Sequence, residues 1–198
     1  MRRIDVLGIL FGVVVLLIVL LAFAAKRKFK GDRTECPYHL KMAYVAYETA
    51  RSDFGKPAGL LDKYTQSREF DHKQPEVFFR LLCSNGLGLA ETICPLDNRR
   101  VAVSVPTLVS SNLSYFISAS PNSGDPYRIL AGNRNIAASK RLIDLTTNRI
   151  TGWDASQGLH RANGFLLFGD GSVGQVSASE LSRRAGLPSN HTNVLAVP

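Results

Sequence analysis

The longest apolar pattern in the chain is an uncharged run from Val6 to Ala25, which contains only Val, Leu, Ile, Phe, Ala and Gly. A helix of this length spans about 30 Å, the thickness of a bilayer's hydrocarbon core. We therefore expect a transmembrane helix over residues 6–25. A cleaved signal peptide is the alternative, since Ala22-Phe23-Ala24 imitates its cleavage site, although its apolar region is usually shorter. A buried core helix is disfavoured, because small domains rarely enclose a helix that is apolar all round.

A second, amphipathic pattern follows over residues 37–54. Leu40, Tyr44 and Tyr47 recur at helical spacing, while charged side chains fall elsewhere on the helical wheel. Pro37 suits the first turn of a helix, where its missing N–H costs nothing. We expect this helix to pack its aromatic stripe in a domain core, after a kink or short joint that separates it from the apolar helix.

The rest of the chain carries shorter patterns. Asp170-Gly171 between two β-prone runs predicts a two-residue hairpin, because both central residues must reach positive φ. Ser177 followed by Glu180 matches a capping box and predicts a short helix ending near Gly186. We also expect a helix over 75–82, strands over 92–94, 101–105, 113–118 and 127–131, and a loose tail over 187–198. This order favours an α+β fold with an antiparallel sheet.

The predicted organisation has four segments. They are an N-terminal segment (1–25), a basic juxtamembrane joint (26–36), an α+β head (37–186) and the C-terminal tail (187–198). The chain has 198 residues, which leaves room for one ordinary domain after the apolar helix.

The net charge of +8 is uneven, since basic residues crowd the segment from Lys26 to Arg33. Such a cluster beside a membrane span normally contacts lipid headgroups. The other basic residues are scattered among acids without interleaved aromatic residues, so we expect no nucleic-acid partner.

The residues leave the orientation of the head open. The basic cluster outweighs Arg2 and Arg3, which favours a cytoplasmic head under the positive-inside rule. The three cysteines, Cys36, Cys83 and Cys94, would allow one disulfide in an exported compartment.

No spacing in the chain predicts catalysis or metal binding. A Ser-His-Asp triad can be drawn with His160 and Asp170, but there is no G-x-S-x-G elbow, and the hairpin already requires Asp170. The histidines and cysteines lack the short spacings of metal ligands. Aspartates in turns could bind calcium, but turn formation explains them as well. We expect no catalytic residue, no cofactor and no metal.

One longer spacing is informative. His160 precedes Asp170-Gly171 by nine intervening residues, with Asn163-Gly164 before an apolar strand. This stretch, HRANGFLLFGDGSV, resembles the H-x9-DG motif of pilin-like proteins of planctomycete and verrucomicrobial bacteria. Other segments resemble that family in the same order: CPYHLK at 36–41 (C-x-x-N-L-K), ICPLD at 93–97 (a CPSD-like turn), SYF at 114–116, and LAGNRN at 130–135 (LAGDRN).

The resemblance implies a type IV pilin-like or type II secretion pseudopilin-like protein. Its N-terminal helix would cross the inner membrane once and pack in a filament core, and its head would lie in the periplasm. We therefore predict a non-enzymatic structural protein whose partners are the lipid bilayer and other pilin-like subunits or secretion machinery. The alternative is a membrane-anchored extracytoplasmic binding domain that does not assemble.

The resemblance also sets expectations for single residues. The glycine and Phe-Thr-Leu-x-Glu start of a prepilin are absent, so Asp5 is the candidate for the acidic assembly contact. We expect His160 to face the Asp170 hairpin and to help fix it. With the head outside the cytoplasm, we expect Cys94 to form a disulfide with Cys36 or Cys83.

Overall fold

The fold is seen in a computed structural model of the chain. It describes residues 3–54, 74–118, 124–137, 142–145, 150, 152–157, 159, 160, 162–187, 190 and 194–198. Within the first of these ranges, it describes the side chains of residues 13–21 and 34–52. The chain divides into two units, Met1–Glu35 and Cys36–Pro198, and we call the second unit the head.

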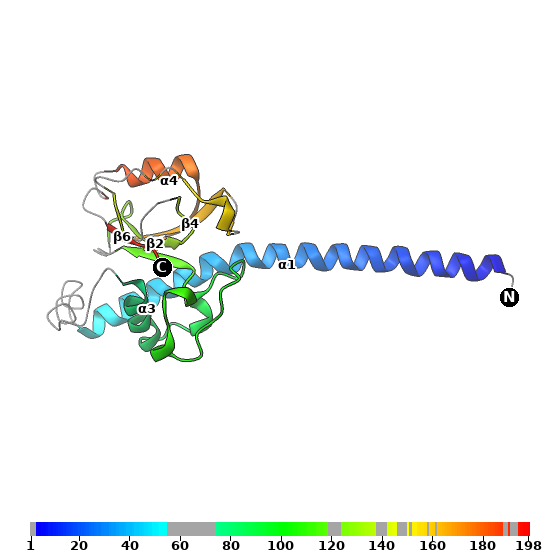
Figure 1. The fold of residues 1–198 in the computed structure, drawn as a ribbon, viewed down its shortest axis with the longest axis horizontal. Coiled ribbons are helices and arrows are strands. Elements are labelled where there is room, and N and C mark those ends of the chain that lie inside the picture. The colour runs from blue at the N-terminus through cyan, green and yellow to red at the C-terminus, as the bar shows by residue number, and fades with distance from the viewer. Residues whose placement is uncertain are drawn as a thin grey trace. The chain divides into compact units, whose positions relative to one another are not determined.

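Helix α1 is continuous from Arg3 to Phe54 (Figure 1). Pro37 lies inside this helix and not in a first turn, so the separate helix expected to begin at residue 37 is wrong. A proline here removes one helical hydrogen bond, and α1 continues through Pro37 despite this loss. The side chains of Asp5 and of the basic cluster from Lys26 to Arg33 lie outside the described residues.

The first unit corrects the predicted transmembrane helix. Among the described residues, no helix combines the length and the apolar character needed to cross a bilayer. In the first unit, the described apolar side chains run from Val13 to Leu21. All of these side chains are exposed, between 43% and 62%.

The head confirms the predicted α+β class with an antiparallel sheet. Its six strands lie in the order β3-β6-β1-β2-β4-β5, and every described pairing is antiparallel. The strands are β1 (Tyr115–Ser118), β2 (Ile129–Asn133), β3 (Leu142–Asp144), β4 (Asn163–Phe168), β5 (Val173–Ser177) and β6 (Val194–Ala196).

Each face of the sheet carries its own hydrophobic core. On one side, the part of α1 within the head packs with α3 (Pro75–Ser84) against residues such as Ile117 and Leu167. On the other side, α4 (Ala178–Ala185) covers a core around Phe116 and Leu166. Figure 1 shows α4 and α3 on opposite sides of the strands. The packing predicted for the amphipathic helix is confirmed, because Leu40 and Tyr47 are buried in the first core.

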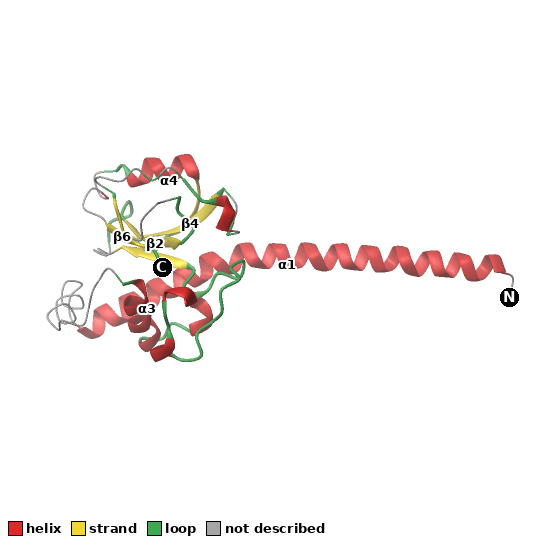
Figure 2. Cartoon of the chain, in the orientation of Figure 1, coloured by secondary structure: helices red, strands yellow, loops and turns green. Residues whose placement is uncertain are grey.

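Two strand predictions are wrong because the residues lie in a region of loops. Short 3₁₀ helices at Leu89–Thr92 and Val105–Thr107 replace the strands expected at 92–94 and 101–105 (Figure 2). The alternating valines are not buried, and Val103 is 95% exposed. Side-chain hydrogen bonds hold this region instead, as when Arg80 Nε donates to the Leu108 carbonyl at 3.0 Å.

The predicted C-terminal tail is also wrong in part. Within 187–198, β6 (Val194–Ala196) lies between β3 and β1, and Leu195 is fully buried. Three apolar residues are too few to show a strand period, so only the sheet identifies them.

The hairpin at Asp170-Gly171 and the capped helix are confirmed, but the two-residue turn is wrong. Strands β4 and β5 pair as predicted, and Gly171 has φ +78°, whereas Asp170 does not have a positive φ. Gly171 N donates to the Phe168 carbonyl at 2.9 Å, so Gly169 and Asp170 are the central residues of the turn. Ser177 Oγ accepts a hydrogen bond from Glu180 N at 3.3 Å and begins α4.

Gly171→Ala tests how strongly the hairpin is held. A Cβ at Gly171 would overlap the Tyr44 ring at a positive φ, so we expect a loss of about 2–4 kcal/mol of unfolding free energy. Urea unfolding of the full chain measures this loss. Gly174→Ala is the matched control, because its Cβ would meet Phe168 at an ordinary 3.6 Å and should leave the unfolding free energy unchanged or raise it by about 1 kcal/mol or less. Equal losses in the two variants would contradict the close packing at Gly171.

Candidate functional site

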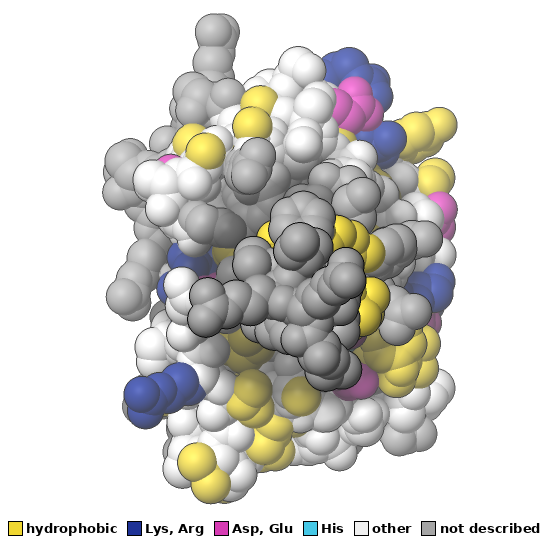
Figure 3. Space-filling model, turned by 90° about the vertical axis from the view of Figure 1, so that its right-hand side faces the viewer, with side chains coloured by type: hydrophobic (Ala, Val, Ile, Leu, Met, Phe, Trp, Pro, Cys, Tyr) yellow, Lys and Arg dark blue, Asp and Glu magenta, His cyan; other side chains and the backbone are white. Residues whose placement is uncertain are grey.

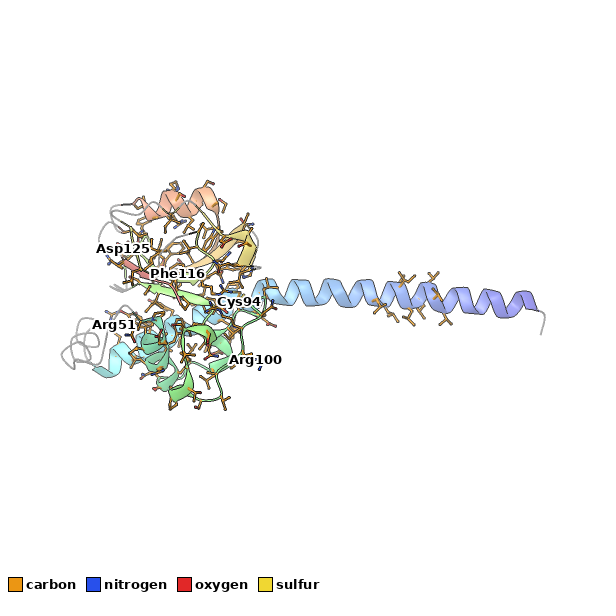
Figure 4. All side chains as sticks on the ribbon, in the orientation of Figure 1. Arg51, Cys94, Arg100, Phe116 and Asp125 are labelled. Carbon is orange, nitrogen blue, oxygen red and sulfur yellow. The ribbon has the colours of Figure 1, made fainter. Side chains whose placement is uncertain are left out.

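The candidate site is a cluster of two thiols and one imidazole from three distant segments. Cys36 lies on α1, Cys94 in the turn after the first 3₁₀ helix, and His160 shortly before β4 (Figure 4 labels Cys94). The two Sγ atoms are 2.8 Å apart, and Cys94 Sγ lies 3.3 Å from His160 Nε2. The three ligand atoms all lie within 4.8 Å of one another. We call these residues the thiol–imidazole cluster.

Two further polar groups contact the sulfur of Cys36. The hydroxyl of Tyr115, on β1, lies 3.3 Å from Cys36 Sγ. The amide Nδ2 of Asn133, on β2, donates to the same sulfur at 3.3 Å. Asn133 Oδ1 accepts from Phe165 N at 2.6 Å, and this bond sets the orientation of the amide. The buried sulfur is therefore surrounded by hydrogen-bonding groups.

The pKa values of the two thiols in the cluster are shifted in opposite directions. Burial raises the pKa of Cys36, but hydrogen bonds with Cys94, His160, Tyr115 and Asn133 outweigh it and lower the pKa to about 5. The hydrogen bond with Cys36, followed by burial, raises the pKa of Cys94 far above its usual value. The hydrogen bond between the two sulfurs therefore shifts the two pKa values in opposite directions.

His160 is held in an unusual backbone conformation. Its φ of +42° makes it the one non-glycine residue with positive φ among the described residues. Such strain costs about 1–3 kcal/mol and persists where surrounding contacts enforce it. The ring packs edge-on against Phe165, with centroids 5.0 Å apart. Asn135 Nδ2 donates to the carbonyl of Leu159, the preceding residue, at 3.0 Å. These contacts direct the imidazole toward Cys94.

A nearly buried ion pair fixes the turn that carries Cys94. Asp97 N donates to the Cys94 carbonyl at 2.8 Å, which closes the turn. The Asp97 carboxylate accepts from Arg134 Nε and from Ser114 Oγ, both at 2.8 Å. Burial raises the pKa of Asp97, but these hydrogen bonds and the Arg134 charge outweigh it and hold the pKa below its usual value. The turn is thereby joined to the sheet.

The residues of the H-x9-DG motif separate into two places. Asp170 Oδ1 accepts from Ser172 N at 2.9 Å within the hairpin, and Lys41 Nζ donates to the Gly171 carbonyl at 2.8 Å. No described contact joins Asp170 to His160, so the expectation that His160 faces the hairpin is wrong. The physical reason is β4, whose six extended residues separate the two by about 20 Å.

The remaining motif residues have structural roles. Asn163 N donates to the His160 carbonyl at 3.2 Å, which closes the turn before β4. Gly164 lies against Trp153, and a Cβ there would come within 2.6 Å of the indole ring.

The structure records Cys36, Cys83 and Cys94 as free thiols, and the disulfide expected for Cys94 stays a prediction. Of the two partners considered, Cys36 is the one that lies beside Cys94. Cys83 lies on α3, where burial raises the pKa of its thiol to about 11.

The sequence singled out His160, Cys36 and Cys94 as candidate residues but did not predict that they lie close to one another. Cys36 and Cys94 are 58 residues apart, and Cys94 and His160 are 66 apart, so no short-range spacing reveals the cluster. Tyr115 and Asn133 were missed as site residues. They lie within SYF and LAGNRN, two segments singled out for their resemblance to the pilin-like family.

Comparisons with protein-family models, curated proteins and solved structures found no match for this chain. The resemblance to pilin-like proteins therefore stays a prediction. The inner-membrane location, the periplasmic head and the named partners stay predictions too.

Asp97→Asn tests the ion pair beside the cluster. Loss of the carboxylate charge opposite Arg134 should lower the unfolding free energy by about 2–3 kcal/mol at neutral pH. Because the folded-state pKa of Asp97 is lowered, its contribution is complete above its ordinary value of about 3.9 and is lost as the pH falls further. Urea unfolding from pH 7 to pH 3 measures the difference in unfolding free energy between the wild type and Asp97→Asn. This difference should become smaller below about pH 4.

Glu180→Gln is the control for Asp97→Asn. Glu180 pairs with Arg183 and Arg184 at the surface, so its loss should lower the unfolding free energy much less than the loss of the Asp97 charge. If the loss of unfolding free energy in Asp97→Asn stays constant from pH 7 to pH 3, the stabilising role assigned to the ionised Asp97 carboxylate is contradicted.

Proposed function

We propose that this chain is a non-enzymatic structural subunit that self-associates through the apolar part of α1 and displays the head. The observation that carries the proposal is the exposed run from Val13 to Leu21. Nine successive residues turn through about two and a half helical turns, so apolar side chains face every direction around the helix. A helix that is apolar all round requires cover on all sides.

Copies of the same helix are well suited to provide that cover. Burial of one Val, Leu or Ile side chain contributes about 1.5–3 kcal/mol, so uncovered apolar stretches mark interaction sites. A single partner would cover one face only, whereas a bundle of several copies covers all of them. This expectation agrees with the filament role implied by the resemblance to pilin-like proteins.

The head supports a structural role more than a catalytic one. Cys36 and Cys94 are both fully buried, so a substrate has no direct access to their sulfurs. On the face drawn in Figure 3, the described basic side chains are scattered and several lie beside acidic ones. That distribution differs from the concentrated basic surface used to bind nucleic acids.

Self-association of the full chain tests the proposal. Leu16→Lys and Ile18→Lys place one charge each on nearly opposite sides of α1, about 200° apart. In a multi-copy bundle both sides are covered, so each variant should weaken self-association at least about tenfold, or about 1.4 kcal/mol. Sedimentation and chemical cross-linking over a concentration series measure the effect.

Val103→Lys is the matched control, because Val103 is also an exposed apolar residue but belongs to the head. Its self-association should equal that of the wild type. A wild-type chain that stays monomeric over the whole series would overturn the proposal in favour of a non-assembling binding domain. Weakening by only one of the two α1 variants would contradict a multi-copy bundle and indicate a two-helix contact.

A further inference from the structure

The thiol–imidazole cluster has chemistry that self-association does not use. We propose that Cys36, Cys94 and His160 are the protein ligands of one zinc ion in the head. The site joins α1, the turn at Cys94 and the segment before β4. This inference is independent of the role proposed for the apolar part of α1.

The ligand atoms suit zinc in type and in spacing. Zn²⁺ is bound by Cys sulfur at about 2.3 Å and His nitrogen at about 2.0–2.1 Å, usually in tetrahedral geometry. Two sulfurs on such an ion lie about 3.8 Å apart. The Sγ atoms of Cys36 and Cys94, now 2.8 Å apart, would separate by about 1 Å, a shift within reach of a side-chain rotation.

Charge balance favours Zn²⁺ over other metals that prefer thiolates. Two thiolates and a neutral imidazole carry two negative charges, which Zn²⁺ cancels. A Cu⁺ ion at the same ligands would leave one net negative charge in a buried site, which is costly. Zinc therefore fits the burial of Cys36 and Cys94 best.

The groups around the ligands match a site built for a thiolate. Tyr115 OH and Asn133 Nδ2 both lie within hydrogen-bond distance of Cys36 Sγ, and both residues are buried. Donors of this kind orient metal-bound thiolates and tune their charge. A disulfide sulfur accepts hydrogen bonds only weakly, so a Cys36–Cys94 disulfide would leave the buried Asn133 amide poorly satisfied.

His160 gives a second reason to prefer a metal over a disulfide. A disulfide between Cys36 and Cys94 does not need an imidazole, yet His160 keeps a strained φ of +42° with its Nε2 3.3 Å from Cys94 Sγ. Strain of this kind is typical of functional positions. His160 is only partly buried, so it supplies a route for the ion, and three protein ligands leave a fourth position for water.

Zinc titration of the full chain tests the proposal. The chain is reduced with a phosphine, freed of metal with a chelator and titrated with Zn²⁺ against a chromophoric competitor. We expect about one zinc per wild-type chain, and a higher Tm with zinc than without it, because the ion binds the folded state. Cobalt substitution should add a thiolate-to-metal charge-transfer band.

Four variants locate the site. Cys94→Ser and His160→Ala should lose stoichiometric binding and the Tm shift, whereas Cys83→Ser, the matched control outside the cluster, should bind like the wild type. Tyr115→Phe removes only the hydroxyl near Cys36 Sγ and should weaken the zinc affinity by about 10-fold to 100-fold. Circular dichroism checks that each variant is folded. If Cys94→Ser does not fold, the partly exposed His160→Ala decides.

Three outcomes would overturn the proposal. The first is a reduced, folded wild-type chain that binds no zinc. The second is wild-type affinity in a folded Cys94→Ser or His160→Ala variant. The third is a chain purified with a Cys36–Cys94 disulfide that takes up no zinc after reduction, which would show that the pair is a structural disulfide.

Discussion

The packing of the head depends on the hydrogen-bond partners of the buried Cys36 sulfur. Cys36 lies on α1, but the groups that contact its sulfur come from the turn at Cys94, from β1 and from β2. Burial of a polar or charged atom is tolerated only when such partners are in place. The same contacts therefore fix α1 against the sheet, and the Asp97–Arg134 ion pair holds the Cys94 turn in register with them.

The two units differ in how they deal with apolar surface. The head covers both faces of its sheet, one with α1 and α3 and the other with α4. The run from Val13 to Leu21 stays exposed on every side of α1. This contrast separates the buried polar contacts of the head from the exposed apolar surface of the N-terminal part of α1.

Sequence patterns predicted the elements whose signals are local. The Asp170-Gly171 hairpin and the helix capped by Ser177 are encoded within a few residues, and both are confirmed. Strand β6 was missed because three apolar residues show no period, and the strand expected near Val103 was wrong because alternation there does not lead to burial. The break expected at Pro37 was wrong because a local penalty does not decide whether a long helix ends.

The candidate site was only partly predictable for a related reason. Its ligands come from segments tens of residues apart, and only the fold brings them together. The nine-residue spacing of the motif was visible, but strand β4 carries Asp170 away from His160. Two segments noted for their resemblance to a family contain Tyr115 and Asn133, but the resemblance did not reveal that these side chains contact Cys36.

X-ray absorption spectroscopy at the zinc edge tests the central claim most directly, because it counts the ligands of the bound ion. For the reduced, zinc-loaded chain, the account predicts two sulfur ligands at about 2.3 Å and nitrogen or oxygen ligands at about 2.0–2.1 Å, including an imidazole. A spectrum with only nitrogen and oxygen ligands, or with a single sulfur, would contradict it.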